Sequence, residues 1–377
     1  MPNAPEAARA EIRALDLAAE WAELGEELER AALRVLASGR YVLGPEVEAF
    51  EREFARFQRV EHAVGVASGT DALVLALRAL GVERGDRVLT SPFTFFASAA
   101  SIDWIGARVV LCDVEPDTAL IDPKRVEDTL EGVACILPVH LYGALADMQR
   151  LRALADLAGA SLVEDAAQAH GAERDGVRAG ELGDAAAFSF YPTKNLGAAG
   201  EAGAVLTRRE DLALRLRRLR DHGSSAKYQH AEVGTNSRLH ALQAALLSVK
   251  LPRLEQWNER RRQLAALYDA AFAGSESVRP LARPPRSRCA YHQYTVRLVD
   301  RDRDRVAAGL AARGIHAAVH YPLPVHLQPA ASGWGYGPGS LPVAEGLARE
   351  VLCLPVHPYL GASDVERVAD ALLDLAR

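Results

Sequence analysis

Apolar residues recur at helical spacing through the first sixty residues of the chain. One apolar side is formed by Leu24, Leu28, Ala31, Ala32 and Val35, and it stops at Ser38-Gly39. A second helix is predicted from Gly44-Pro45, because proline is favoured at the first helical position. The N-terminal segment is therefore expected to be helical.

From there to about residue 207, short apolar runs alternate with helical patterns. The strand candidates are Ala63–Ala67, Arg87–Ser91, Arg108–Cys112, Ala134–Val139, Ser161–Glu164, Ala186–Phe190 and Ala204–Thr207. Several are apolar almost throughout, which is typical of strands buried on both faces of a mainly parallel sheet covered by helices. Ligands of such sheets gather where strands end and helices begin.

The C-terminal part of the chain repeats this alternation on a smaller scale. It carries a helical region from Leu239 to Phe272 interrupted at Pro252, a strand at Tyr291–Leu298, a helix at Arg303–Ala312, Gly- and Pro-rich loops from Tyr321 to Gly339, and a final helix from Ala362. A chain of 377 residues has room for two domains. We expect a large domain over residues 1–250, including the N-terminal helical segment, and a smaller C-terminal α/β domain over 251–377.

Composition and charge exclude several classes of protein. The chain has 44 Lys and Arg against 50 Asp and Glu, a net charge of −6, which gives no reason to expect nucleic acid or an anionic membrane as partner. The N-terminus has no signal-peptide pattern, and no apolar stretch is long enough to span a bilayer. The four cysteines form no CxxC pair, so buried thiols in a reducing cytoplasm are expected. The arginine runs at 208–220 and 260–262 are interpreted as solvated helix faces.

Three sites along the chain carry candidate chemistry. Ser68-Gly69-Thr70 lies between a strand and a helix, and its N–H groups would make either a phosphate cradle or an ordinary N-cap. Glu164 and Asp165 end an apolar strand, where a carboxylate either holds a protonated heterocyclic nitrogen or reaches solvent from a capped turn. Lys194 follows the aromatic run Phe188–Tyr191 and precedes a small-residue loop, an enclosed position in which a lysine can lose its proton and form a Schiff base.

Together these sites match the needs of one cofactor. Pyridoxal phosphate requires a phosphate anchor, a carboxylate for its pyridine nitrogen and a lysine for its aldehyde. They occur here in chain order, with the lysine 194 − 165 = 29 residues after the acid. An aromatic segment, Phe93–Phe96, either stacks on the ring or belongs to the core. The combination favours an aminotransferase in which Lys194 holds the cofactor as an imine.

Longer motifs resemble one family over almost the whole chain. The stretches are Tyr41-Val42-Leu43-Gly44-Pro45-Glu46-Val47, Ser68-Gly69-Thr70-Asp71-Ala72-Leu73, Val139-His140-Leu141-Tyr142-Gly143, Glu164-Asp165-Ala166-Ala167-Gln168-Ala169-His170-Gly171, Phe188-Ser189-Phe190 through Lys194-Asn195, Asn236-Ser237-Arg238-Leu239 and His320-Tyr321-Pro322. They are similar to the DegT/DnrJ/EryC1/StrS family of sugar aminotransferases, which are fold type I pyridoxal phosphate enzymes. The implied fold is aspartate-aminotransferase-like, with a mainly parallel seven-stranded sheet in the large domain. Relatives usually read Gly-Glu-Gly-Gly where this chain has Gly200-Glu201-Ala202-Gly203.

The resemblance implies a role for each matching residue. Lys194 corresponds to the Schiff-base lysine and proton shuttle, and Asp165 to the acid on the pyridine nitrogen. The other implied cofactor contacts are Gly69, Thr70 and Ser189 to the phosphate, Gln168 to the ring hydroxyl, Phe95 to the ring face and Asn236 to the phosphate of the other subunit in a homodimer with shared sites. Substrate contacts are expected from Tyr191, Arg238, His320 and Tyr321, with Arg238 able to bind a diphosphate. Some relatives that dehydrate sugars carry histidine in place of this lysine.

The resemblance also narrows the reaction. The segment from Asp221 to Arg238 is similar to that of members acting on 3-keto sugars. We therefore expect transfer of an amino group, by analogy from glutamate, through pyridoxamine phosphate to a 3-keto dTDP- or UDP-linked deoxy sugar. A 4-keto sugar or cyclitol ketone remains an alternative, as does a non-catalytic regulator on the same scaffold. His316, His320 and His326 superficially resemble a metal site, but they follow Gly314 in an expected short strand, and no metal is predicted.

Overall fold

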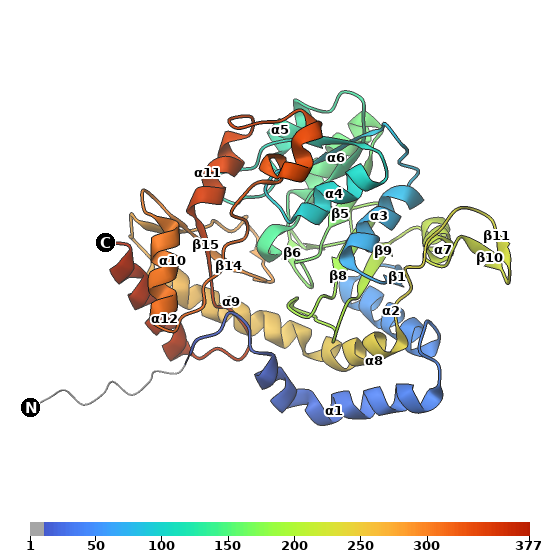
Figure 1. Ribbon diagram of the computed structural model, residues 1–377, viewed down its shortest axis with the longest axis horizontal. Coiled ribbons are helices and arrows are strands. Elements are labelled where there is room, and N and C mark those ends of the chain that lie inside the picture. The colour runs from blue at the N-terminus through green and yellow to red at the C-terminus, as the bar shows by residue number, and fades with distance from the viewer. Residues whose placement is uncertain (1–10) are drawn as a thin grey trace, which may run out of the picture.

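A seven-stranded sheet with helices on both faces forms the centre of the computed structural model, which describes residues 11–377 (Figure 1). Its strands are His62–Val66 (β1), Arg87–Thr90 (β2), Arg108–Leu111 (β3), Val133–Leu137 (β4), Ser161–Asp165 (β5), Ala185–Ser189 (β8) and Gly203–Thr207 (β9). They lie in the order β1-β9-β8-β5-β4-β2-β3, and only β9 runs antiparallel to its neighbours. The predicted α/β fold is confirmed, and each of the seven predicted strands overlaps one of these.

Burial on both faces explains why these strands read as continuous apolar runs. On β8, Ala185 and Ala187 belong to the apolar core on one side of the sheet, while Ala186 and Phe188 belong to the core on the other. Successive side chains of a strand point to opposite faces, so a strand covered twice needs apolar residues at every position. The sheet is thus fixed from both sides, and its strand ends are held in place.

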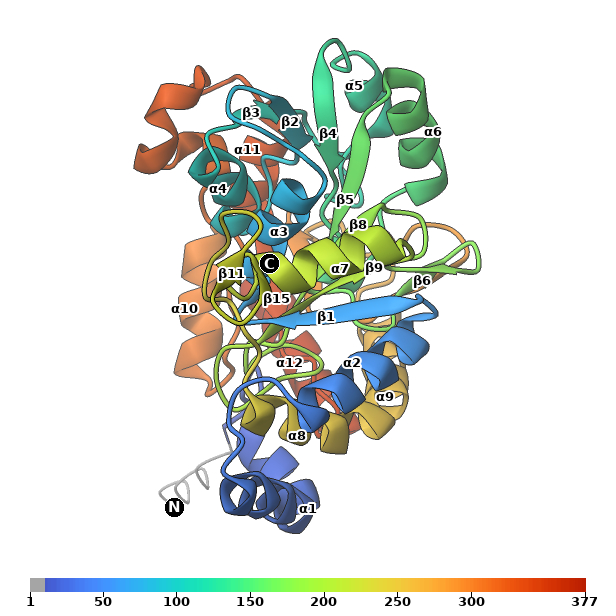
Figure 2. The same cartoon turned by 90° about the vertical axis from the view of Figure 1, so that its right-hand side faces the viewer.

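Within the described part of the chain, eight α-helices lie before residue 251. They are Leu17–Ser38 (α1), Pro45–Gln58 (α2), Gly69–Ala79 (α3), Phe96–Trp104 (α4), Pro123–Glu127 (α5), Met148–Ala158 (α6), Glu210–Leu219 (α7) and Ala241–Lys250 (α8), with a 3-10 turn at Leu141–Gly143 (η1). Helices α3, α4 and α7 contribute to the core on one face, and α2 and α8 to the core on the other. Helix α1 packs on α8 at one end of the molecule (Figure 2).

A second, three-stranded sheet organises the C-terminal part. Its elements are Leu251–Arg253 (η2), Leu254–Ala271 (α9), Val278–Pro280 (β12), Tyr294–Leu298 (β14), Arg303–Ala312 (α10), Val325–Leu327 (η3), Pro329–Trp334 (η4), Pro342–Glu350 (α11), Val351–Leu354 (β15) and Ala362–Leu375 (α12). The strands lie in the order β12-β14-β15. One apolar cluster contains Leu73 as well as Val325 and Leu347, so the two parts of the chain share a core. The predicted domain boundary after residue 250 therefore stays a prediction.

Two details of the sequence reading are wrong in this region. The strand predicted from Tyr291 begins only at Tyr294, because Tyr291 has a positive φ of 45° that interrupts an extended chain. The short strand expected around His316 and His320 is absent, since the chain there makes only isolated bridges at Ile315 and Ala318.

Two further small sheets are formed by short strands outside the large sheet. Glu173–Arg174 (β6), Val177–Arg178 (β7) and Ser287–Arg288 (β13) form one small sheet, and Ser224–Ala226 (β10) pairs with Gln229–His230 (β11). The β10–β11 hairpin projects from the body of the molecule beyond α7 (Figure 1). Within residues 11–377, no helix combines the length and apolar character needed to cross a bilayer.

The predicted solvated faces of the arginine runs need one correction. Arg208 and Arg209 are exposed, as expected, but Arg220 is buried and its Nη1 lies 2.5 Å from Glu51. Arg261 is buried as well and donates to the carbonyl oxygens of Tyr291 and Val356. A buried guanidinium is tolerated only where such acceptors surround it, and the linear sequence does not reveal them.

Candidate active site

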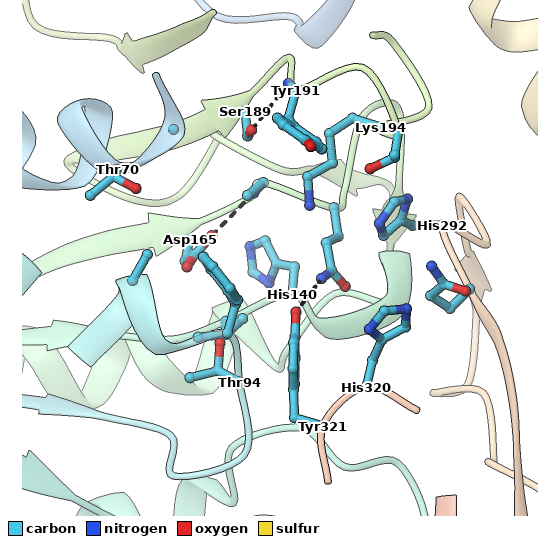
Figure 3. Close-up of a pocket in the computed structure, with 18 of the residues that line it drawn as sticks. Thr70, Thr94, His140, Asp165, Ser189, Tyr191, Lys194, His292, His320 and Tyr321 are labelled. Atoms are coloured by element: carbon cyan, nitrogen blue, oxygen red, sulfur yellow. Dashed lines mark hydrogen bonds between the residues drawn. The ribbon is translucent and has the colours of Figure 1, made fainter. Parts of the chain in front are cut away.

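One cavity of about 720 Å³ lies at the ends of the parallel strands (Figure 3). The predicted site residues that line it are Gly69, Thr70, Phe95, Asp165, Gln168, Ser189, Tyr191, Lys194, His320 and Tyr321. Asn236 and Arg238 do not line it. Residues up to 252 positions apart in sequence thus meet here, as expected for a site at the strand ends of an α/β sheet.

The start of α3 provides a group of free N–H donors at this cavity. Ser68 precedes the helix, and its hydroxyl accepts a hydrogen bond from the N–H of Asp71 at 3.1 Å. The N–H groups of Gly69 and Thr70 belong to the first turn, where no helical carbonyl is available to them. A side chain at position 69 would place its Cβ only 2.6 Å from Cβ of Ser189. Glycine therefore lets the helix start approach Ser189, and together they form a cradle suited to an anion.

Asp165 ends β5 and faces the cavity. It is 6% exposed, and its two oxygens accept hydrogen bonds from the Ser98 hydroxyl at 2.6 Å and from the N–H of Ala167 at 3.2 Å. None of the residues in the range 11–377 forms an ion pair with it within 4.0 Å. A buried carboxylate held by neutral donors is suited to a cationic partner from a ligand.

Lys194 lies in the turn after β8, and its side chain points into the cavity (Figure 3). Its N–H donates to the carbonyl oxygen of Tyr191 at 2.8 Å, which fixes the turn. Burial lowers the pKa of the amine from its ordinary value of 10.5 to about 8, and the nearby Asp165 carboxylate opposes this effect. At pH 7 about a tenth of the amine is then unprotonated, far more than for an ordinary lysine, and the free amine is the form that a nucleophilic lysine requires.

Gln168 and two aromatic residues line the opposite wall. The side-chain oxygen of Gln168 accepts a hydrogen bond from the N–H of Tyr142 at 2.6 Å, and its amide nitrogen lies 3.4 Å from the Tyr321 hydroxyl. The rings of Phe95 and Tyr321 lie 6.0 Å apart at 40°. Burial, with Asp165 nearby, raises the pKa of Tyr321, so its hydroxyl stays protonated. This wall offers a flat aromatic surface and neutral hydrogen-bond donors.

An anion cradle, a buried acid and a weakly basic lysine thus surround one cavity. The match to a protein family identifies the ligand that these groups bind. The family model described as the DegT/DnrJ/EryC1/StrS aminotransferase family matches residues 22–373. The chain belongs to this family. The residues present fit pyridoxal phosphate, the cofactor of the family, because its phosphate, pyridine nitrogen and aldehyde match the cradle, the acid and the lysine. The predicted cofactor and enzyme class are confirmed.

Individual relatives in the family are similar over most of their length. A dTDP-3-amino-3,4,6-trideoxy-alpha-D-glucose transaminase of Streptomyces venezuelae is 48% identical over 96% of this chain and 95% of that protein. The crystal structure of S. venezuelae DesV in complex with a ketimine intermediate superposes with a TM-score of 0.94 at 48% identity, covering 97% and 99% of the two chains. NtdA of Bacillus subtilis, solved with bound cofactor PMP, reaches 0.87 at 28% identity, covering 94% and 82%.

Two predicted site residues lie outside this chain's own cavity. Asn236 is exposed, and its side-chain oxygen accepts a hydrogen bond from Nε of Arg238 at 3.0 Å. Nη1 of Arg238 lies 3.1 Å from a carboxylate oxygen of Asp221. The expected role of Asn236 at the cofactor of the other subunit and that of Arg238 at the substrate diphosphate stay predictions.

The one departure from the family pattern is accommodated by packing. Ala202 is fully buried in the apolar cluster around Phe190, and its carbonyl accepts the N–H of Phe190 at 2.8 Å. The neighbouring Gly203 has no such room, since a Cβ there would lie 2.4 Å from the carbonyl oxygen of Ser68. The extra methyl group thus stands at the position of the turn that has space for it.

Sequence reasoning missed several residues around the cavity. Ser98, His140, Arg261 and His292 were not singled out, although Ser98 contacts Asp165 directly and the other three line the cavity. Only His140 stood within a family motif. Among residues 11–377, no group of three or more His, Cys, Asp or Glu side chains is arranged to hold a metal ion. His316 instead contacts Glu11, and His326 contacts Glu345.

Proposed function

We propose that the protein transfers an amino group from glutamate to the C3 ketone of a dTDP-linked deoxy sugar, with the cofactor attached to Lys194. The observation that carries this proposal is that Lys194 and Asp165 face the same buried cavity, with the start of α3 opening onto it. The relative in S. venezuelae is named for a dTDP-3-amino sugar, and the segment from Asp221 to Arg238 resembles members that act on 3-keto sugars.

Each wall of the cavity has an assigned partner. When bound, pyridoxal phosphate supplies an aldehyde that carries the amino group and a pyridine ring that accepts electrons. We assign the phosphate to the N–H groups of Gly69 and Thr70 and to the Ser189 hydroxyl. Phe95 and Gln168 line the same cavity, and Phe95 would cover one face of the ring while the amide nitrogen of Gln168 would donate to the ring hydroxyl.

Asp165 and Lys194 divide the proton chemistry between them. The Asp165 carboxylate keeps a proton on the pyridine nitrogen, because separating that ion pair inside the cavity is unfavourable. Lys194 would hold the aldehyde through Nζ, and as a free amine it would carry a proton to and from the reacting carbon. A pKa of about 8 lets the amine take and return this proton near neutral pH.

The sugar substrate enters between the aromatic wall and the C-terminal loops. We assign its contacts to Tyr191, His320 and Tyr321, which line the cavity. Arg238 and Asn236 are assigned to the cavity of a second copy, with Arg238 on the substrate diphosphate and Asn236 on the cofactor phosphate. The functional unit is then a homodimer with shared sites. The four free, buried cysteines fit a cytoplasmic location.

Borohydride trapping tests the attachment. Reduction of the wild-type protein with its cofactor should fix the cofactor mass on the peptide that contains Lys194, and Lys194→Ala should abolish this product. If wild type traps no cofactor there, the proposed role of Lys194 is wrong.

Single-turnover spectroscopy tests the substrate. The protein is converted to its pyridoxamine phosphate form and mixed separately with a 3-keto dTDP-sugar, its UDP counterpart, a 4-keto dTDP-sugar and a cyclitol ketone. We expect the 3-keto dTDP-sugar to restore the pyridoxal phosphate absorption fastest. Faster conversion of the 4-keto sugar or the cyclitol would overturn the assigned substrate while leaving the aminotransferase class intact. Glutamate is compared with glutamine and alanine as amino donor in the other half-reaction, which converts the pyridoxal phosphate form to the pyridoxamine phosphate form.

A further inference from the structure

A chain of buried side-chain amides runs behind Lys194 and ends at His292. Asn195 follows Lys194 directly, and its Nδ2 donates to Oδ1 of Asn258 at 2.9 Å and to the carbonyl oxygen of Ala290 at 2.8 Å. Nδ2 of Asn258 donates in turn to the carbonyl oxygen of His170 at 2.7 Å. Oδ1 of Asn195 lies 3.2 Å from Nδ1 of His292.

The backbone carbonyls of this chain determine the orientation of both amides. A carbonyl oxygen only accepts, so Asn258 must turn its Nδ2 toward His170 and its Oδ1 toward Asn195. Asn195 then presents its Nδ2 to two acceptors and its Oδ1 to His292. This oxygen requires a proton on Nδ1 of the imidazole. In the neutral ring, Nε2 is therefore the unprotonated nitrogen.

The surroundings keep the His292 ring neutral. Burial lowers the pKa of His292 well below its ordinary value. The charges of Lys194 and Arg261 and the imidazoles of His170 and His320 act in the same direction. The ring thus offers a lone pair, and no proton, on Nε2.

His292 and Lys194 both face the cavity with an unused polar atom. Figure 3 shows the His292 ring beside the Lys194 side chain, on the side where His320 also lies. Within the described residues, neither Nζ of Lys194 nor Nε2 of His292 has a hydrogen-bond partner. Asn195 follows Lys194 in the chain, and adjacent Cα atoms are about 3.8 Å apart. The hydrogen bond between Asn195 and His292 therefore fixes the imidazole ring relative to the backbone of Lys194.

We propose that Nε2 of His292 is the acceptor to which the Lys194 amine turns when it is free of the cofactor. The flexible lysine side chain can reach this contact by a change of rotamer and does not make it in the rotamer of this structure (Figure 3). This inference rests on the proposed role of Lys194. A lysine side chain has four rotatable bonds, so a displaced amine needs a fixed partner if it is to return to the reacting carbon. A neutral acceptor holds the amine without competing for its proton. His292 is therefore a positioning residue, and Asn195 fixes its tautomer.

The composition of the chain allows a direct test on the cofactor-free protein. It contains only four lysines, Lys124, Lys194, Lys227 and Lys250. Labelling lysine with ¹³C at Cε therefore gives four NMR signals, and Lys194→Ala identifies the one of interest. Its chemical shift, followed against pH, reports the protonation midpoint of the Lys194 amine.

We expect His292→Leu to lower this midpoint by about one pH unit, because a lost acceptor disfavours the ammonium form. His292→Gln keeps an acceptor oxygen and should restore most of the difference. His326→Gln is the matched control, since His326 is also buried but contacts Glu345 outside the cavity. The midpoint of Lys194 in this variant should equal that of wild type. Asp165, which raises the pKa of the Lys194 amine, and His170 and His320, whose pKa the Lys194 charge lowers, are unchanged in all three variants.

Two results would overturn the inference. An unchanged midpoint in His292→Leu means that the ring does not contact the amine, and a raised midpoint means that His292 is a cation. If His292→Leu does not fold, Asn195→Ala takes its place, because a ring free to change tautomer should also lower the midpoint. The NMR measurement needs no cofactor, whereas borohydride trapping does. A failed trap therefore contradicts the proposed function, and a failed midpoint shift contradicts only the role of His292.

Discussion

Glu164 and Asp165 are neighbours on β5, and their carboxylates point to opposite faces of the sheet. Asp165 faces the cavity, whereas Glu164 is fully buried and lies 2.8 Å from Nε2 of His140. Glu164 also accepts hydrogen bonds from the N–H groups of Gly180 and Gly183 at 2.8 and 2.7 Å. Successive residues of a strand point to opposite faces, so one carboxylate is available to a ligand and the other braces the loop before β8.

Asp165→Asn should separate catalysis from folding. The amide has nearly the same shape but no charge, so it no longer holds a proton on the pyridine nitrogen. We expect the protein to fold and to trap cofactor at Lys194, while kcat falls roughly 10²- to 10⁴-fold. The check is steady-state kinetics beside a thermal melt. A variant within a few-fold of wild-type kcat would show that the ring nitrogen does not depend on Asp165.

Glu164→Gln should have the opposite profile. Both oxygens of Glu164 contact the buried groups of Gly180, Gly183 and His140, and an amide replaces one of these oxygens with an NH₂ group. At least one buried donor therefore faces another donor and loses its acceptor. We expect a loss of about 3 kcal/mol or more in the free energy of unfolding, measured by urea titration. Activity per folded molecule should stay much closer to wild type than in Asp165→Asn. A melting point equal to that of wild type would contradict this bracing role.

The contrast between these two residues shows what the sequence reveals. The strands were predictable because burial on both faces leaves runs such as Ala186–Phe190. Asp165 was found because it ends such a strand, and Lys194 because it follows one. Their motif was specific enough to indicate the cofactor. The Glu164–His140 pair was not found, since its meaning depends on contacts with a loop 16 to 19 residues further along the chain.

His292 could not be found for a related reason. It stands in the aromatic stretch Tyr291–Tyr294, which reads as an ordinary strand. Its tautomer depends on Asn195, 97 residues earlier, and on two backbone carbonyls that only the folded chain brings together. Long-range hydrogen bonds of this kind leave no periodic pattern in a single sequence.

Gly69→Ala should weaken cofactor binding at the phosphate end. The new Cβ would lie 2.6 Å from Cβ of Ser189, so the start of α3 and Ser189 must move apart and the cradle widens. We expect the dissociation constant of the cofactor to rise at least about tenfold, measured by fluorescence titration. Gly346→Ala in α11 is the control, because a Cβ there meets nothing within 4 Å and alanine favours a helix. Equal cofactor affinity in both variants would rule out the cradle.

Lys194→Met should make the cofactor-free protein more stable near neutral pH. The native pKa of about 8 lies below the ordinary 10.5, so folding is penalised wherever the unfolded amine is charged. This penalty is full below pH 8, fades between pH 8 and 10.5, and vanishes above. We expect a gain of about 3 kcal/mol at pH 7 that shrinks toward pH 10, measured by urea unfolding at both pH values.

Lys250→Met provides the matched control for this prediction. Lys250 is also buried, but its amine lies 2.5 Å from Glu20 and 2.8 Å from the carbonyl oxygen of Gly197. Methionine leaves the Glu20 carboxylate and the Gly197 carbonyl without their buried donor, so this variant should lose stability at every pH. If both methionine variants lose stability to a similar extent, Lys194 is a paired structural lysine and its lowered pKa has no effect on folding.

Co-expression of two inactive variants tests whether Asn236 acts across a subunit interface. Asn236 does not line the cavity of its own chain, and it precedes Ser237, which contacts Asp71 in α3. In a mixed dimer of Lys194→Ala with Asn236→Ala, one cavity contains both changes and the other contains neither if Asn236 belongs to the partner. Random pairing makes half of the dimers mixed, so about a quarter of wild-type activity should return. If Asn236 serves its own chain, every cavity carries one change, and the mixture stays as inactive as the separate variants.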